Sequence, residues 1–362
     1  MGCTKYIRFN TSVEEAHWDD EKRRWKVDVK VTGGKDAEFN PQYSIDCDFL
    51  VSAVGQLNQP RFPDIEGLED FQGKIMHSAR WDWSHSLEGK KVGIIGNDGE
   101  ENGLWEKLTP DYNPGCKRVI ISDDYYPAVA DPKTTLETNK IARITPTGIQ
   151  LENGTTYEHD IIVLATGFRT VEFMYPIKIT GTGGRSLEQI WEKGASALYG
   201  TTVPSLPNFG MFYGPNTNLG HNSIILMIEA QSRYLNTLVS AVLDARNRGQ
   251  RIGLTPRSDR TDAFNQQIQE ILQNSSFADP KCGSWYKNKD GKITNNWSGT
   301  VVEYQEMLSK VDWEDFETTV GEREGERARD EDWEGAGGDG GEQHGVGAGD
   351  VECGCGGRGV GV

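Results

Sequence analysis

Two adjacent basic residues, Lys117 and Arg118, are well suited to hold a negative charge. They open a strand-like run at residues 119–122. A guanidinium stays protonated and presents a forked set of donors, so Arg118 could stabilise an anionic oxygen in a pocket that excludes water. The same pair could also be a solvated basic patch at the start of a strand.

A second set of residues stands at fixed spacing in residues 71–82, which read FQGKIMHSARWD. The fixed positions are Phe71, Gly73, His77, Trp81 and Asp82. A single His or Trp most often only packs, and the segment could be an ordinary loop with one structural histidine. The complete pattern, placed just before a strand-like run at residues 91–96, favours a functional interpretation.

This pattern resembles the fingerprint of the Baeyer–Villiger branch of FAD- and NADPH-dependent flavin monooxygenases, F-x-G-x-x-x-H-x-x-x-W followed by Pro or Asp. The resemblance covers roughly residues 6–316. Other segments that carry it are SAVGQLNQP at 52–60, GCKR at 115–118, DIIVLATGF at 160–168 and SWY at 284–286. It implies an α/β fold of Rossmann-like dinucleotide-binding domains with β-rich returning segments. Trp81 and Asp82 favour this branch over the N- or S-oxygenating branch.

The resemblance also implies a reaction. In that family NADPH reduces FAD, and the reduced flavin takes up O2 as a C4a-peroxyflavin that inserts one oxygen atom into a ketone. The implied partners are therefore FAD, NADPH, O2 and a small ketone or other soft organic substrate. By position, Arg118 would stabilise the peroxyflavin anion and Lys117 would contact the 2′-phosphate of NADPH. His77 and Trp81 would couple domain movement rather than touch the substrate.

Further cofactor contacts are implied at five positions outside the fingerprint. Gly167 closes an apolar strand and Gly96 ends another, and small residues let the backbone approach a dinucleotide. Gly214 and Asn216 lie in a turn-rich loop before an amphipathic helix expected at 223–245, a loop that flanks the flavin in the family. Trp285 would reach the nicotinamide ribose. His221 could face a ligand or could be structural.

Two departures from the family pattern concern the glycine-rich turns that hold pyrophosphate at a helix N-terminus. No G-x-G-x-x-G lies before residue 60. After Gly96, Asp98 replaces the second glycine, and Glu100 and Glu101 would oppose a pyrophosphate. We therefore expect a fragment, a mispredicted gene model or a degenerate paralogue, an incomplete two-dinucleotide-binding-domain flavoprotein. The alternatives to an active Baeyer–Villiger enzyme are an inactive fragment or interaction protein of this lineage, and an N- or S-oxygenating enzyme.

The expected organisation follows from these segments. Residues 1–90 form part of the FAD-binding domain with a linker, 91–112 a remnant of the NADPH-binding domain, and 113–316 the second FAD-binding segment. Residues 317–362 are Glu-, Asp- and Gly-rich with few apolar side chains, which predicts a disordered tail.

Composition restricts the remaining function classes. The net charge of −17 argues against a nucleic-acid partner, and no stretch reaches the roughly 20 apolar residues of a membrane span. Six cysteines occur without a C-x-x-C pair, so the sequence supports neither a metal site nor a disulfide framework. A reducing cytoplasmic setting is the default expectation.

Overall fold

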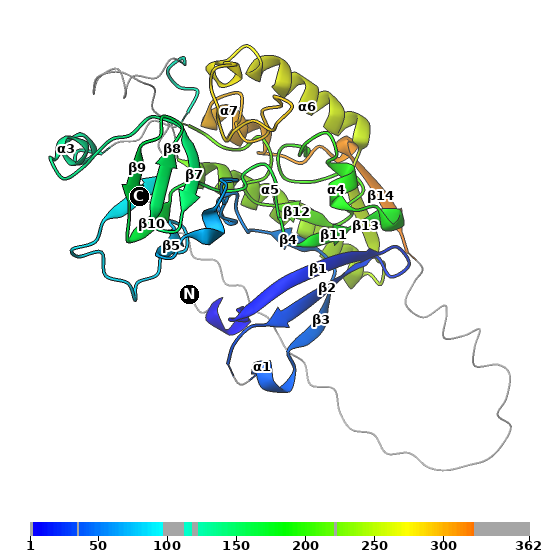
Figure 1. Ribbon diagram of the computed structural model, residues 1–362. Helices are drawn as coiled ribbons and strands as arrows, with labels where there is room; N and C mark the ends of the chain where they lie inside the picture. Colours follow the sequence, from blue (N-terminus) through cyan, green and yellow to red (C-terminus); the bar gives the residue numbers. More distant parts are fainter. Residues whose placement is uncertain (1–2, 35, 97–111, 118–121, 221–222, 322–362) are drawn as a thin grey trace, which may run out of the picture. The chain divides into compact units, whose positions relative to one another are not determined.

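The computed structural model describes residues 3–34, 36–96, 112–117, 122–220 and 223–321 (Figure 1). Residues 1–323 form one compact unit, and the second unit, 324–362, lies outside the described residues. Within the described ranges the strands form five small sheets of two to four strands.

The four-stranded sheet has the order β11-β1-β2-β3. Its strands are β1 (Thr11–Asp19), β2 (Arg24–Val31), β3 (Gln42–Cys47) and β11 (Lys178–Thr180), with the short helix α1 (Asp36–Phe39) between β2 and β3. The sequence RWKVDVKV of β2 alternates apolar and polar side chains, as a half-buried strand does, and every second residue from Trp25 to Val31 is buried. Trp25 is fully buried, and its indole N–H donates to the carbonyl of Pro207 at 2.8 Å.

A parallel sheet contains the strands that flank the fingerprint, in the order β5-β10-β6. They are β5 (Lys74–His77), β6 (Val92–Ile95) and β10 (Ile161–Leu164). The central strand β10 is buried at all four residues, as its apolar run predicts. Because β10 lies between β5 and β6, this sheet crosses the domain boundary expected at 112/113.

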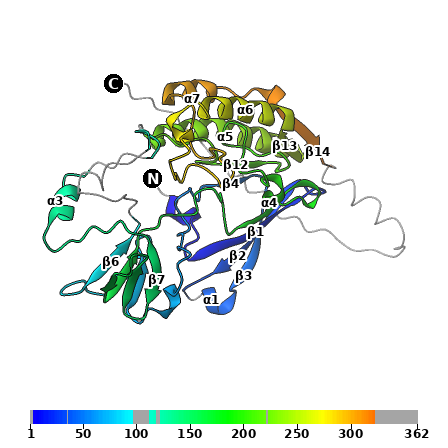
Figure 2. The same cartoon turned by 45° about the horizontal axis from the view of Figure 1, so that its top comes forward.

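An antiparallel sheet packs beside the parallel one (Figures 1 and 2). It contains β7 (Ile141–Thr145), β8 (Gly148–Leu151) and β9 (Thr156–Glu158). Asn153 and Gly154 lie in the turn that joins β8 to β9, and Gly154 has a φ of 86° there. Ile144 and Ile149 pack against Ile162 in a shared core.

The remaining elements in the described ranges are strand pairs, helices and 3₁₀ turns. The two-stranded pairs are β4 (Leu50–Ser52) with β12 (Phe209–Met211), which are parallel, and β13 (Ile252–Pro256) with β14 (Phe316–Val320), which are antiparallel. The helices are α3 (Tyr125–Ala130), α4 (Leu187–Ile190), α5 (Ile224–Asn247), α6 (Ser258–Leu272) and α7 (Val301–Met307). The 3₁₀ turns are Cys3–Tyr6, Leu68–Asp70, Thr182–Gly184, Ser276–Ala278 and Trp313–Asp315.

The helix predicted at residues 223–245 is confirmed as α5. It buries Met227, Tyr234, Leu238 and Val242 along one face, at helical spacing. That face packs against β13 and α7. None of the helices in the described ranges is long and apolar enough to cross a bilayer.

The expected start of the disordered tail at residue 317 is wrong. Residues 316–320 form β14, which pairs with β13 along its whole length. Phe316 anchors the strand in the core at 8% exposure, and Thr318, Thr319 and Val320 favour extended structure. The acidic composition of the following residues obscured this strand in the sequence.

Candidate functional site

His77, the histidine of the fingerprint, ends β5 and is 2% exposed. Its Nδ1 accepts a hydrogen bond from the backbone N–H of Ala79 at 3.0 Å, and its Nε2 lies 3.4 Å from Thr166 Oγ1. The ring centroid lies 5.4 Å from that of Phe62 and 6.3 Å from that of Phe168. His77 therefore contacts the segment that follows β4 and the segment that follows β10.

Those two segments run antiparallel to each other. The N–H of Arg61 donates to the carbonyl of Gly167, and the N–H of Arg169 donates to the carbonyl of Gln59, both at 2.9 Å. A β-bridge joins Pro60 and Phe168 between these bonds. The segments 52–60 and 160–168, which carry the family resemblance, thus form one paired crossing.

The other fingerprint residues hold the segment in place. Phe71 is buried in the core shared by the two neighbouring sheets, and a side chain at Gly73 would overlap the carbonyl of Asp160. Asp82 accepts hydrogen bonds from Lys74 Nζ and from Ser84 Oγ, each at 2.6 Å. The Lys74 ammonium, helped by Ser84, holds the pKa of Asp82 far below its usual range.

Trp81 packs at the edge of the second core of the parallel sheet and lies 6.2 Å from Trp83. The structure therefore places the five fingerprint residues along one segment, with His77 at the crossing. It does not gather them around a single reacting point.

Beyond the crossing, a buried amide network gathers several of the segments that carry the resemblance. Asn295, fully buried, donates through Nδ2 to Gln56 Oε1 at 2.9 Å and to the carbonyl of Thr170 at 3.2 Å. Gln56 donates through Nε2 to the carbonyl of Tyr213 at 3.2 Å and lies 3.5 Å from that of Gly214. We call these residues the amide network.

Sequence reasoning missed Gln56 and Asn295. The signal for Gln56 was its place inside SAVGQLNQP, where a polar residue follows the short strand β4. Asn295 carried no recognisable signal, because its role depends on a partner 239 residues away.

The loop at 214–218 is fixed by protein contacts. Asn216 has a φ of 57° and is 2% exposed, and its Nδ2 donates to the carbonyls of Ile293 and Asn296 at 2.8 and 2.9 Å. A side chain at Gly214 would overlap Met211 and the carbonyl of Gly200. Both residues shape the loop, which the resemblance places beside a flavin. The expected donor His221 lies outside the described residues.

The glycines test whether a dinucleotide fits this arrangement. Gly55 and Gly167 have φ angles of 73° and 74°, and a Cβ built on either meets nothing within 4 Å. These half-buried glycines flank the crossing and leave room for a ligand, so this region fits FAD. A Cβ on Gly96 would overlap the carbonyl of Ala165. Close packing against Ala165, the residue after β10, accounts for Gly96.

Lys117 and Trp285 lie on two segments that a covalent bond joins. A disulfide connects Cys116 to Cys282, and both cysteines are buried. The expectation that the cysteines give no disulfide is therefore wrong for this pair. The two residues are 166 positions apart, so spacing alone could not indicate the bridge.

The surroundings of these two residues differ. The ammonium of Lys117 lies 4.7 Å from the ring centre of Tyr112, and the carbonyl of Trp285 accepts from Thr170 Oγ1 at 2.7 Å. Because Thr170 also belongs to the amide network, Trp285 is connected to that network. Arg118, the proposed catalytic residue, lies outside the described residues.

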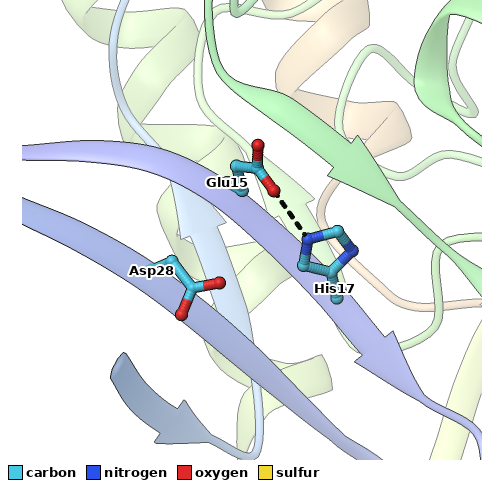
Figure 3. Close-up of side chains that lie close together, drawn as sticks. All are labelled: Glu15, His17 and Asp28. Carbon is cyan, nitrogen blue, oxygen red and sulfur yellow. Dashed lines mark hydrogen bonds and ion pairs between the residues drawn. The ribbon is translucent and has the colours of Figure 1, made fainter. Parts of the chain in front are cut away.

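A separate cluster of possible metal ligands lies on the solvent-exposed face of β1 and β2: Glu15, His17 and Asp28 (Figure 3). Glu15 receives a hydrogen bond from Lys178 Nζ at 2.9 Å and lies 3.1 Å from His17 Nε2. The Lys178 ammonium and then His17 lower the pKa of Glu15. The carboxylates already have protein partners, and the cluster is unconnected to the crossing.

Comparison with known proteins identifies relatives for most of the chain. No profile of a known protein family matches it. A FAD-binding monooxygenase of Aspergillus niger, ktnD, is 42% identical over 406 residues, covering 87% of this chain and 67% of that protein. A Baeyer–Villiger monooxygenase of Streptomyces coelicolor is 29% identical, covering 88% and 76% of the two chains. The 406-residue alignment is longer than the 362 residues of this chain, so the Aspergillus relative carries residues within the matched region that are missing here.

Solved structures share the fold. A crystal structure of OTEMO with FAD and NADP superposes with a TM-score of 0.71 at 18% identity, covering 87% of this chain and 82% of that one. A steroid monooxygenase bound to NADP gives a TM-score of 0.69 at 21% identity, with 88% and 82% covered. These matches confirm the expected two-dinucleotide-binding-domain flavoprotein fold. The 42% identity to a FAD-binding monooxygenase shows that the chain belongs to the FAD-binding monooxygenases, and proteins named Baeyer–Villiger monooxygenases are among its more distant relatives.

Proposed function

We propose that this chain binds FAD and NADPH and inserts one oxygen atom of O2 into a ketone, giving an ester or lactone. The amide network is the observation that carries the proposal. It joins Gln56, the 213–214 turn, Thr170 and Asn295, which come from segments far apart in the sequence. These segments resemble the flavin-binding parts of the family, and the relatives are named as FAD-binding and Baeyer–Villiger monooxygenases.

The open glycines support a flavin at the crossing. Gly55 and Gly167 leave space where any other residue would place a side chain. Bound flavin, once reduced, would supply the activation of O2. The protein residues around it would position the ring and exclude water, which strengthens each electrostatic contact.

The basic residues Lys117 and Arg118 would each bind a negatively charged group. Arg118 would stabilise the anionic oxygen that develops during insertion, since its guanidinium cannot lose its proton. Lys117 and Trp285 would contact the phosphate and ribose of NADPH.

His77 and Trp81 would transmit movement rather than contact substrate. His77 packs on both segments of the paired crossing. A displacement of the parallel sheet that carries β5 would therefore move the crossing with it.

A visible absorption spectrum tests the proposal first. The purified chain is mixed with FAD, desalted and scanned, and we expect a retained flavin band. NADPH consumption and ester formation are then followed with cyclic and linear ketones, with amines and sulfides in parallel. Loss of the flavin on desalting, or NADPH consumption without any ester, would refute the proposal.

Arg118→Ala provides the residue-level test. We expect it to keep FAD while losing at least about 100-fold in ester formation, the usual loss for a group that stabilises a developing oxyanion. Arg143→Ala is the matched control, because Arg143 is a half-exposed arginine paired with Glu66 at 3.6 Å on the β7 strand.

A further inference from the structure

The segment at residues 112–117 is joined to the loop at residues 276–286 by two independent links. The first is the disulfide between Cys116 and Cys282. The second is a hydrogen bond from the backbone N–H of Asn113 to Asp279 Oδ2 at 2.8 Å. The backbone N–H groups of Asn113 and then Lys281 lower the pKa of Asp279, which keeps this acceptor ionised.

The loop itself is firmly held in the core. Tyr286 is fully buried and packs edge-on against Phe277, with ring centres 5.5 Å apart. The carbonyl of Trp285 accepts from Thr170, and Lys287 Nζ donates to the carbonyl of Asp279 at 2.8 Å. The loop therefore provides a fixed base to which the 112–117 segment is tethered.

We propose that the Cys116–Cys282 disulfide is a redox-controlled tether that sets the affinity of this chain for NADP(H). The proposal rests on the proposed function, because it uses Lys117 and Trp285 as nucleotide contacts. Lys117 follows Cys116 directly, and Trp285 lies three residues after Cys282. The bridge therefore fixes the distance between the residue assigned to the 2′-phosphate and the residue assigned to the ribose.

The redox step is a two-electron exchange. When the bridge forms, the two thiols together lose two protons and two electrons. A peroxide accepts them, and its O–O bond breaks. The products are one water molecule and either an alcohol or a second water molecule. In the reverse direction, a dithiol thiolate attacks one sulfur and displaces the other as a thiolate. The second thiol of the reductant then attacks the mixed disulfide and releases the remaining cysteine.

Burial couples this chemistry to ligand binding. Cys116 is 0% exposed and Cys282 is 2% exposed, so a reductant reaches the bridge only when the tethered segment opens. A nucleotide that contacts Lys117 and Trp285 together favours the closed arrangement. It should therefore favour the oxidised form of the bridge at equilibrium, and by linkage reduction should weaken nucleotide binding by the same coupling free energy.

The experiment uses the full chain loaded with FAD. Its NADP⁺ dissociation constant is measured by calorimetry before reduction, after reduction with a dithiol, and after reoxidation with hydrogen peroxide. Alkylation and intact mass report the state of the bridge at each stage. We expect reduction to raise the dissociation constant about tenfold, within the usual range of coupling between sites, and reoxidation to restore it. Saturating NADP⁺ should shift the dithiol–disulfide equilibrium of the bridge toward the oxidised form by the same factor.

Two variants separate this bridge from other thiols. Cys116→Ser with Cys282→Ser should bind NADP⁺ like the reduced wild type and should not respond to reductant. Cys47→Ser is the control and should respond like the wild type. Cys47 is half-buried, and its burial raises the pKa of its thiol to about 11, so it reacts poorly. The wild-type redox cycle needs neither variant to fold.

The outcomes separate the tether from the proposed function. An NADP⁺ affinity that is equal in the oxidised and reduced chains overturns the tether alone. Alkylation of Cys116 and Cys282 without any reductant overturns it as well, since no bridge then exists. Absence of NADP⁺ binding in every redox state overturns the NADPH part of the proposed function, and the tether with it.

Discussion

Two adjacent asparagines give the sharpest test of the amide network. Asn295 and Asn296 are both fully buried in the same loop. The side chain of Asn295 makes three hydrogen bonds, to Gln56, to the carbonyl of Thr170 and from Thr294 Oγ1. The side-chain amide of Asn296 has no hydrogen-bond partner among the described residues. Replacing each with leucine, which has a similar size, should therefore give opposite results.

The magnitudes follow from what each change leaves behind. Asn295→Leu leaves Gln56 Oε1, the carbonyl of Thr170 and the hydroxyl of Thr294 buried without their partner. At about 1–3 kcal/mol for each orphaned group, and with partial relaxation, the free energy of unfolding should fall by about 3–6 kcal/mol. That is a large part of the roughly 5–15 kcal/mol that stabilises a typical domain. Asn296→Leu removes an amide that is already unpaired, so its effect should stay within about 1 kcal/mol or be stabilising.

The assay is urea unfolding of both variants and the wild type, followed by circular dichroism, with FAD retention after desalting as a second measurement. Asn295→Leu should also release FAD, because the network fixes the 213–214 turn and Thr170 around the crossing. Equal losses of stability in the two variants would show that the amide network does not stabilise the fold. A loss of less than about 1 kcal/mol for Asn295→Leu would show the same, because an ordinary surface change or a single weak hydrogen bond has that effect.

The other predictions concern glycines and pH. Gly96→Ala should lower the free energy of unfolding by at least about 2 kcal/mol, as measured by urea unfolding. A strained backbone alone costs about 1–3 kcal/mol, and the added methyl group would overlap Ala165. Gly167→Ala meets open space, so it should cost only about 1 kcal/mol for its left-handed backbone while weakening FAD binding in a fluorescence titration; equal FAD affinity would contradict the flavin assignment. Hydrogen bonds from the backbone and side chain of Asn139, followed by Tyr157, lower the pKa of Glu137 to about 2 from its usual value of 4.5. The depressed pKa adds to the free energy of unfolding above pH 4.5, and this contribution should be lost as the pH falls toward 2. Urea unfolding at several pH values should show that Glu137→Gln loses less stability over this range than the wild type.

The sequence predicted the regular parts of the fold because their signals are local. Alternating burial in β2, the continuous apolar run of β10 and the helical spacing of α5 each follow from residues close in the chain. The start of the tail failed because five residues of β14 are stabilised by pairing with a strand some 60 residues earlier. Such pairing has no local signal when the surrounding composition is acidic.

The candidate site also contains residues that a local motif indicates and residues that no local motif indicates. The fingerprint and the glycine positions were found from motifs, although Gly96 and Gly214 prove to be required by packing against protein atoms. Asn295 and the Cys116–Cys282 bridge depend on contacts across more than 160 residues. Neither contact can be predicted from motif spacing, because nothing in the local sequence distinguishes these residues before the chain folds.

The two groups of site residues are held by different kinds of bond, and this difference has a functional consequence. Gln56, Thr170 and Asn295 surround the proposed flavin region through amide and carbonyl hydrogen bonds, which a reductant does not change. The segment that carries Lys117 is instead joined to its loop by the disulfide and one hydrogen bond. A reductant should therefore weaken NADP⁺ binding while leaving FAD in place. If both cofactors were lost together, the bridge would be stabilising the whole unit, and a selective effect on the nucleotide would be excluded.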